Sequence, residues 1–218
     1  MSKPVPESSP IAFLSDIHGN LRALDAVLEE LQRRVIERIY VAGDHLLGGD
    51  DPVGVYKRLM QVNAICTRGP GDAALVQIDP DALSPDGDEQ REAARRFKET
   101  RRALGDLALK FLERLPETRR IPLVDGSEIL MVHGSPADPS VEISDDLSDE
   151  EMVELLADDP ADIVVCGASH VPFTRELPEA RVIGLGSVGQ APDGSVAFYT
   201  VVSPRMDGTL IEQSWVDL

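Results

Sequence analysis

The side chains best suited to chemistry stand in short polar segments, each of which directly follows an apolar stretch. Aspartate or histidine occurs in all five segments: Asp16-Ile17-His18-Gly19-Asn20, Gly43-Asp44-His45, Arg68-Gly69-Pro70-Gly71-Asp72, His133-Gly134-Ser135 and Gly167-Ala168-Ser169-His170. Together they contain all four histidines of the chain. Carboxylate and imidazole ligands suit Mn²⁺, Fe²⁺ or Zn²⁺. Cys66 and Cys166 are not spaced as a thiolate ligand pair, so the sequence predicts a divalent metal site without cysteine.

Alternating strands and helices would bring these segments together. The apolar patterns predict strands at Ile11–Ser15, Ile39–Ala42 and Val62–Cys66, and helices at Leu21–Val35, capped by Asn20, and at Pro52–Met60. This order implies a parallel sheet with right-handed crossovers. Ligands of such sheets bind beyond the carboxyl ends of the strands. We therefore expect Asp16, His18, Asp44 and His170 to hold at least one divalent ion at that edge.

The second half of the chain has a different pattern. Residues Asp88–Leu115 form a charged amphipathic segment, typical of one or two surface helices. Beyond it, the turn dipeptides Asp125-Gly126, Asp193-Gly194 and Asp207-Gly208 stand between apolar runs, as in β-hairpins. A largely antiparallel second half is the prediction, with strands at Arg119–Val124, Glu128–Val132 and Ile163–Cys166. Two sheets packed face to face, with helices outside both, would satisfy this order.

Charge and composition narrow the classes of partner. The 218 residues include 39 acidic and 21 basic side chains, which gives a net charge of −18. Such a surface disfavours nucleic acid and anionic membranes, and no apolar run approaches the roughly 20 residues that span a bilayer. Much of the acidic excess lies in Asp145–Asp162, which we expect to be a solvated helix face.

The organisation of the chain is predicted to be simple. Residues Met1–Pro10 are expected to form a frayed tail and residues 11–218 a single domain, because no linker divides the sequence. Two cysteines cannot build a disulfide framework, so we expect both to be buried and the protein to be cytoplasmic. The sequence leaves the oligomeric state open, a homo-oligomer included.

The five segments, in their order and spacing, resemble the motifs of the calcineurin-like metallophosphoesterases, and of small bacterial and archaeal phosphodiesterase-type members above all. The resemblance extends from Ile11 to Val202 and implies a four-layer α-β-β-α sandwich that hydrolyses a phosphorylated small molecule. In that family, two metal ions about 3.5–4 Å apart clamp a phosphoryl group. Carried over by position, Asp16, His18 and His170 would hold the first ion, Asp44 would bridge both ions, and His133 would bind the second.

Three positions depart from the family pattern. Pro70 and Ala168 replace side chains that would ligate the second metal, and Gly71 replaces the histidine that would protonate the leaving group. The resemblance thus implies an intact first site and a degraded second site that binds its ion weakly or only with substrate. Two interpretations follow: a phosphoesterase with altered activity, or a non-catalytic protein that binds a metal and a phosphate compound for regulation.

Three further residues have open roles. His45, next to Asp44, is a weak candidate for a replacement acid, and we favour the alternative that it points away from the site. Arg68 is a candidate phosphate contact, with an ordinary surface salt bridge as the competing interpretation. Asn20 is a candidate phosphate contact by its place in the first motif, besides its role as a helix cap.

Overall fold

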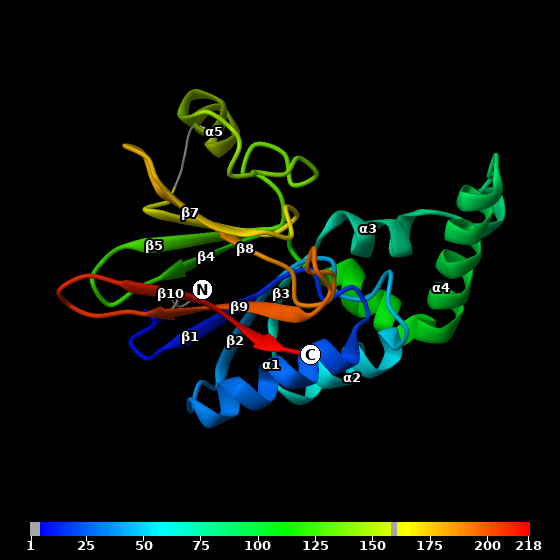
Figure 1. Cartoon of the computed structure of the whole chain (residues 1–218), viewed down its shortest axis with the longest axis horizontal. Helices are drawn as coiled ribbons and strands as arrows, with labels where there is room; N and C mark the ends of the chain where they lie inside the picture. Colours follow the sequence, from blue (N-terminus) through cyan, green and yellow to red (C-terminus); the bar gives the residue numbers. More distant parts are fainter. Residues whose placement is uncertain (1–4, 158–160) are drawn as a thin grey trace.

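The computed structural model describes residues 5–157 and 161–218, which form two five-stranded sheets packed face to face (Figure 1). The first sheet has the order β10-β9-β1-β2-β3, with β1 Ile11–Leu14, β2 Arg38–Ala42, β3 Ile65–Thr67, β9 Val196–Ser203 and β10 Leu210–Asp217. The second has the order β4-β5-β6-β8-β7, with β4 Thr118–Pro122, β5 Glu128–Val132, β6 Ile163–Cys166, β7 Pro172–Glu176 and β8 Arg181–Leu185.

Helices cover the outer faces of both sheets. They are α1 Leu21–Arg33, α2 Pro52–Gln61, α3 Pro70–Gln77, α4 Asp88–Arg114 and α5 Asp149–Leu156, with a 3₁₀ turn at Pro80–Ala82. In Figure 1, α1 and α2 lie on one side of the sheets and α5 on the other, while part of α4 stands away from the strands. The predicted α-β-β-α sandwich with two mixed sheets is confirmed.

The layering follows from the alternation of side chains along the strands. In β1, Ile11 and Phe13 belong to the core between the sheets, whereas Ala12 and Leu14 belong to the core under the helices. The Phe13 ring stacks on Tyr40 of β2, with ring centroids 5.2 Å apart. All four β1 side chains are buried, so this strand is fixed in register and its carboxyl end has a defined position.

The first sheet confirms the parallel arrangement expected from the strand–helix alternation. β1 pairs in parallel with β2, and β2 with β3. Asn20 caps α1 as expected, because its Oδ1 accepts the N–H of Ala23 at 3.1 Å. The third strand begins later than Val62, however. The N–H of Val62 and of Ala64 still bond to carbonyls of α2, so these residues close the helix instead of starting the strand.

The second half of the chain is largely antiparallel, as predicted, because β9 pairs antiparallel with both β1 and β10. The second sheet is mixed: β5, β6 and β8 are parallel to one another, and the edge strands β4 and β7 are antiparallel to them. Asp125-Gly126 and Asp207-Gly208 connect paired strands as predicted. Asp193-Gly194 does not, because β8 and β9 lie in different sheets. A turn dipeptide indicates that the chain reverses its direction locally, but it does not determine which sheet the next strand joins.

Helix α3 is not expected from the sequence, from which Gly69–Asp72 is predicted to be part of a loop. Pro70 stands at its first turn, where a missing N–H costs nothing. Arg101 of α4 donates to the carbonyls of Leu75 and Val76 in α3 and to that of Ile78, the C-cap of this helix. Within α4, Gly105 has φ +65° and divides the helix into two parts. α3 and the first part of α4 are therefore fixed to each other beside the strand ends.

The two cysteines, Cys66 and Cys166, are both buried, as expected. Helix α5 lies in the acidic segment and begins with a capping box of Ser148 and Glu151, while residues 158–160 lie outside the described residues. In the expected amino-terminal tail, Glu7 pairs with Leu123 and accepts the hydroxyl of Tyr40. Among the described residues, none of the helices combines the length and hydrophobicity needed to cross a membrane.

Candidate metal centre

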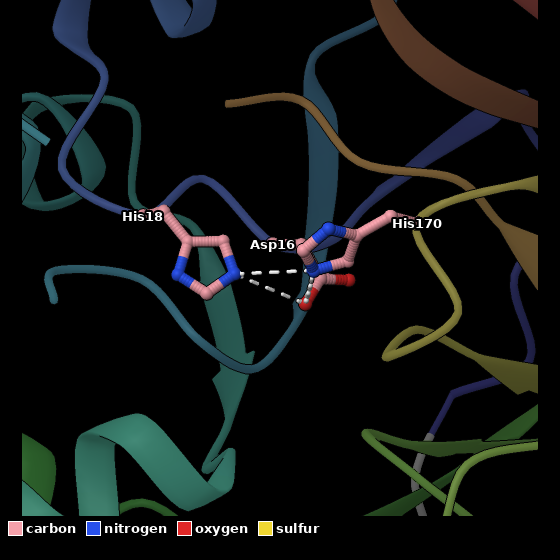
Figure 2. A group of neighbouring side chains, drawn as sticks. All are labelled: Asp16, His18 and His170. Atoms are coloured by element: carbon pink, nitrogen blue, oxygen red, sulfur yellow. Dashed lines mark hydrogen bonds and ion pairs between the residues drawn. The ribbon is translucent and has the colours of Figure 1, made fainter. Parts of the chain in front are cut away.

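The ends of β1 and β6 bring three predicted ligands together. Asp16 and His18 follow β1, and His170 follows β6. Figure 2 shows both imidazole rings turned toward the Asp16 carboxylate. The Nε2 atoms of His18 and His170 lie 3.3 Å apart, and they lie 3.6 and 3.3 Å from Asp16 Oδ1. Atoms that each lie about 2.1 Å from one ion at tetrahedral angles are separated by roughly this much. These three atoms therefore fit one cation.

A second group shares Asp16 with the first. Asp16, Asp44 and His133 also offer ligand atoms within 4.8 Å of one another. His133 Nε2 lies 3.8 Å from Asp16 Oδ1 and 3.7 Å from Asp44 Oδ2, so this group is wider than the first. Asp16 is the carboxylate common to both groups, and the bridging role expected for Asp44 stays a prediction.

Hydrogen bonds to backbone carbonyls orient the rings of His18 and His133. His18 Nδ1 lies 2.8 Å from the carbonyl of Leu47, and His133 Nδ1 lies 2.7 Å from the carbonyl of Ala42. A carbonyl only accepts, so each Nδ1 carries a proton, and in the neutral ring the Nε2 lone pair is then free toward the carboxylates. The neutral ring in this tautomer is the form that binds a metal.

The backbone at the site is held in an unusual conformation. Asp16, His18, Asp44, Ala168 and His170 all have φ between +49° and +66°. Non-glycine residues rarely adopt this region, and it persists where the surrounding structure enforces it. Hydrogen bonds between the loops after β1 and β2 do so here. Asp16 N–H donates to the carbonyl of Gly43 at 3.2 Å, and His18 N–H to that of Asp44 at 2.9 Å.

The electrostatics of Asp16 favour a bound cation. Its side chain is fully buried, and Oδ1 has no hydrogen-bond partner in the described part of the chain. Burial alone would raise the pKa of this carboxyl, but the rings of His170 and His18 and the charge of His133 hold its pKa well below the ordinary value. An ionised, buried oxygen on which two imidazole rings converge needs positive charge close to it, so the residues present fit a divalent metal.

Asp44 is held differently. Burial raises its pKa against the opposing charge of His133, and Asp72 adds to the increase. Its Oδ1 accepts the N–H of Gly71 at 2.8 Å. Any side chain at Gly69 would overlap this carboxylate, because a Cβ there would collide with Asp44 Oδ1 and the Asp44 backbone nitrogen. Glycine at 69 is therefore required for the close approach of α3 to Asp44.

Two of the three departures from the family pattern contact the second group. Gly71 offers only its N–H to Asp44, and Ala168 only its N–H to Asp16 Oδ2, at 3.1 Å. Pro70 has no N–H and an aliphatic ring, so none of the three positions supplies a side-chain ligand. Asp16, Asp44 and His133 are the candidate ligands of this group.

His45 is not part of either group. Its ring is fully buried, and Nδ1 lies 2.6 Å from Asp72 Oδ2 in α3. Burial alone would lower the pKa of His45, but the Asp72 carboxylate and the Cys66 thiol raise it well above the ordinary value. Asp72 has a lowered pKa, because the His45 charge and the N–H groups of Gly69 and His45 outweigh its burial. The pair joins α3 to the loop that carries Asp44.

We expect Asp72→Ala to destabilise the fold by about 3–5 kcal/mol, because it strands a buried His45 charge. His45→Ala in the same chain should recover part of this loss, with a coupling of about 0.5–3 kcal/mol in urea denaturation. The pair should contribute fully to the stability of the fold at pH values between 3.8 and 6.5, the ordinary pKa values of aspartate and histidine. It should be lost as the pH falls through the lowered pKa of Asp72 or rises through the raised pKa of His45. If the losses in free energy of unfolding of the two single variants simply added up in the double variant, the two residues would not be coupled.

The two candidate phosphate contacts have structural partners. Arg68 pairs with Glu117 at 3.1 Å on the surface, which is the salt bridge that competed with the phosphate role. The Asn20 side chain caps α1 through Oδ1 and donates through Nδ2 to the carbonyl of Gly189 at 3.1 Å. Asn20 therefore connects the loop after β1 to the loop after β8.

Sequence reasoning missed the loop after β8. Val188 N–H donates to the carbonyl of Ser15, and Gly189 N–H and Ser187 Oγ donate to that of Asp16. These bonds fix the backbone of the central ligand. The glycine-rich run Gly184-Leu185-Gly186-Ser187-Val188-Gly189, which begins in β8 and continues beyond it, is the signal that would have indicated this loop.

Comparisons with known proteins agree with this geometry. The model of the calcineurin-like phosphoesterase superfamily domain matches residues 10–206. An uncharacterised protein of Methanocaldococcus jannaschii is 27% identical over 206 residues, which cover 85% of this chain and 79% of that protein. Two solved structures, a metallophosphoesterase from Sphaerobacter thermophilus and a hypothetical protein from Pyrococcus horikoshii OT3, have TM-scores of 0.73 and 0.77. They are 24% and 23% identical, and each match covers 95% of this chain and 88% of the other. The chain therefore belongs to the calcineurin-like phosphoesterase superfamily, as a small member of the archaeal and bacterial type.

Proposed function

We propose that this protein is a metal-dependent phosphoesterase in which the group Asp16, His18 and His170 holds one tightly bound ion. The observation that carries the proposal is the buried, unpartnered Asp16 Oδ1, which faces the Nε2 atoms of both histidines at 3.3–3.6 Å. Asp44 is proposed to bridge this ion to the second one. The hydrogen bond with Asp16 and the Leu47 carbonyl raise the pKa of His18 against its burial, and the charge of Asp44 adds to the increase. Mn²⁺, Fe²⁺ and Zn²⁺ all suit these ligands.

The second group is proposed to bind its ion weakly or only together with substrate. It retains Asp44 and His133 beside the shared Asp16, and its ligand atoms are more widely spaced. Substrate phosphate oxygens and water commonly complete the shells of such ions. A bound divalent ion polarises the phosphoryl group and lowers the pKa of a water molecule. The chain itself contributes the orientation of His18 and His133 through their bonds to backbone carbonyls.

The missing acid has a consequence for substrate preference. Gly71 stands where the family has its proton donor, and the ring of His45 is directed to Asp72. A leaving group must then depart without protonation by the protein. We expect esters of acidic alcohols, such as nitrophenyl esters, to be hydrolysed about 10²-fold or more faster than alkyl esters, because general acid catalysis typically contributes 10²–10⁴-fold. Equal rates for both ester classes would indicate a proton donor that we have not assigned.

The alternative is a non-catalytic protein that binds a metal and a phosphate compound on the same scaffold. The loss of side-chain ligands at Pro70 and Ala168, together with the acid at Gly71, favours it. Both interpretations predict metal binding, but only the phosphoesterase predicts turnover of a phosphoester.

The test is hydrolysis of bis(p-nitrophenyl) phosphate in Mn²⁺ by the wild type and by Asp44→Asn. Asparagine keeps the shape and the acceptor for Gly71 N–H but removes the charge that the metals require. We expect turnover by the wild type and at least a 100-fold loss in the variant, with Asp207→Asn in the exposed β9–β10 turn as the control. No turnover by wild-type protein that contains metal would favour the non-catalytic alternative. The cytoplasmic location, the absence of nucleic-acid binding and the oligomeric state remain predictions.

A further inference from the structure

Strand β10 forms an open edge of the first sheet. Its eight residues pair with β9 in an unbroken antiparallel register, from Leu210 opposite Ser203 to Asp217 opposite Val196. In the described part of the chain, no strand pairs with the other side of β10. Every second residue of β10 therefore directs its backbone N–H and C=O away from the sheet, where they are available to another strand.

The edge strands at the other ends of the two sheets are protected. β3 has only three residues, and β7 begins with Pro172 and carries Arg175 and Glu176. β4 ends with Pro122, whose carbonyl accepts the backbone N–H of Glu7 at 2.8 Å, so the amino-terminal segment covers this end of the edge. Short length, proline, charges and covering segments are the usual means that keep an edge from pairing. β10 is longer than the other three edge strands and contains neither proline nor lysine.

Two large apolar side chains of β10 are exposed to solvent. Trp215 is 59% exposed and Leu210 is 49% exposed. Side chains alternate along a strand, so Trp215 lies with Ile211 on the face toward the second sheet, and Leu210 lies with Val216 on the face toward the helices. An element packed on one face would cover only one of the two exposed side chains. A strand added at the edge would cover both.

The edge carries little charge in a chain whose net charge is −18. Glu212 and Asp217 are the charged residues of β10. Glu212 is already paired with Arg34 of α1, because Oε1 and Oε2 accept the two terminal nitrogens of the guanidinium at 2.7 and 3.0 Å. Two copies of the chain repel each other over most of their surfaces. At β10 this repulsion is smallest when no two acidic side chains lie opposite each other.

The sequence of β10 is complementary to itself in one register. A two-fold axis that pairs a strand with its own copy places one residue opposite the same residue of the second copy. An axis at Gln213 gives the apolar side chains apolar partners and separates the charges: Ile211 lies opposite Trp215 of the second copy, Leu210 opposite Val216, and Glu212 opposite Ser214. An axis at Glu212 would place two glutamates opposite each other, and an axis at Ser214 would place Ile211 opposite Asp217.

From these observations we propose that β10 pairs antiparallel with β10 of a second copy of this chain, about a two-fold axis at Gln213. The pair joins the two five-stranded first sheets into one continuous sheet and covers Trp215 and Leu210 of both copies. All candidate metal ligands lie outside β10, so the dimer does not depend on the proposed function.

Sedimentation equilibrium of the full chain tests the pairing. In about 0.15 M salt, where charges are screened beyond about 8 Å, we expect the wild type to form dimers. Trp215→Lys should raise the Kd of the dimer about tenfold or more, because apolar cross-strand pairs are lost and a lysine is placed at the edge. Leu210→Lys should act in the same way and provides a second variant should Trp215→Lys unfold. Leu107→Lys, at an exposed position of α4, is the matched control and should leave the Kd unchanged.

Disulfide cross-linking tests the register. Cys66 and Cys166 are both buried, so an introduced cysteine in β10 supplies the accessible thiol. Opposite residues of an antiparallel pair have Cβ atoms about 4.5–5.5 Å apart, which small shifts bring within the range of a disulfide. On oxidation, Gln213→Cys should therefore form a covalent dimer. Glu212→Cys, whose thiol lies opposite Ser214 of the second copy, should cross-link about tenfold more slowly or less.

Two results would overturn the proposal. One is a wild-type chain that stays monomeric at about 0.1 mM, which would leave this edge to a strand of another protein. The other is a dimer that neither lysine variant of β10 weakens and that Gln213→Cys does not cross-link, because such a dimer would use a different surface.

Discussion

Replacing Asp16 with asparagine is expected to release the tightly bound metal ion, with a loss of affinity of at least 100-fold. Loss of a group that only supports a ligand typically costs 10–100-fold, and Asp16 is itself the shared ligand of both groups. Asparagine is the informative replacement because it tolerates φ +54° and still accepts the N–H of Ala168. The variant should therefore fold and fail only in metal binding, which metal titration by calorimetry measures.

Two further variants test the same ligand assignment. His170→Ala should cause a similar loss, because His170 Nε2 lies 3.3 Å from both other ligand atoms. Asp25→Asn, in α1, should bind metal as the wild type does, because Asp25 pairs with Arg58 and belongs to neither ligand group. Wild-type affinity in Asp16→Asn would show that the ligand assignment is wrong.

The second large effect is expected from restoring the family pattern. Pro70→Asn, Gly71→His and Ala168→His together should rebuild the second group and its proton donor. Proton donation by a placed side chain contributes typically 10²–10⁴-fold. The triple variant should thus hydrolyse alkyl phosphodiesters about 10²-fold faster or more, measured in Mn²⁺ beside the wild type.

The backbone permits these changes. Gly71 lies in the first turn of α3 and does not have the positive φ that would exclude histidine. A Cβ there would lie 3.1 Å from Asp44 Oδ1, so the carboxylate must move by a few tenths of an ångström. Ala168 has φ +66°, where histidine is better tolerated than most residues. Ala168→His alone should restore a ligand but no acid. A triple variant that folds, binds two ions and gains no activity would favour the non-catalytic alternative.

Part of the site could be predicted because local patterns determined it. Parallel strands of one sheet end at a common edge, so the residues after β1 and β2 had to approach one another. Asn20 stood directly before a helical repeat, which is sufficient to predict a cap. His170 follows β6 of the other sheet, so its approach to Asp16 and His18 was implied by the family motifs and not by strand order.

Long-range pairing could not be predicted in the same way. The insertion of β8 between β6 and β7 in the second sheet depends on contacts between distant segments, and turn dipeptides do not specify them. Helix α3 begins at Gly69-Pro70-Gly71, a sequence typical of a loop, and is stabilised by Asp72 and by Arg101 of another helix. That Asp16 belongs to both ligand groups depends on side-chain positions that spacing does not determine.

Anomalous diffraction from crystals grown with Mn²⁺ tests the central claim most directly, because it locates the ions without reference to activity. We expect one strong peak in contact with Asp16 Oδ1, His18 Nε2 and His170 Nε2, and a weaker peak beside Asp44 and His133. Two peaks of equal, full occupancy held by protein ligands alone would contradict the unequal sites. The absence of a peak at Asp16 would contradict the metal centre itself.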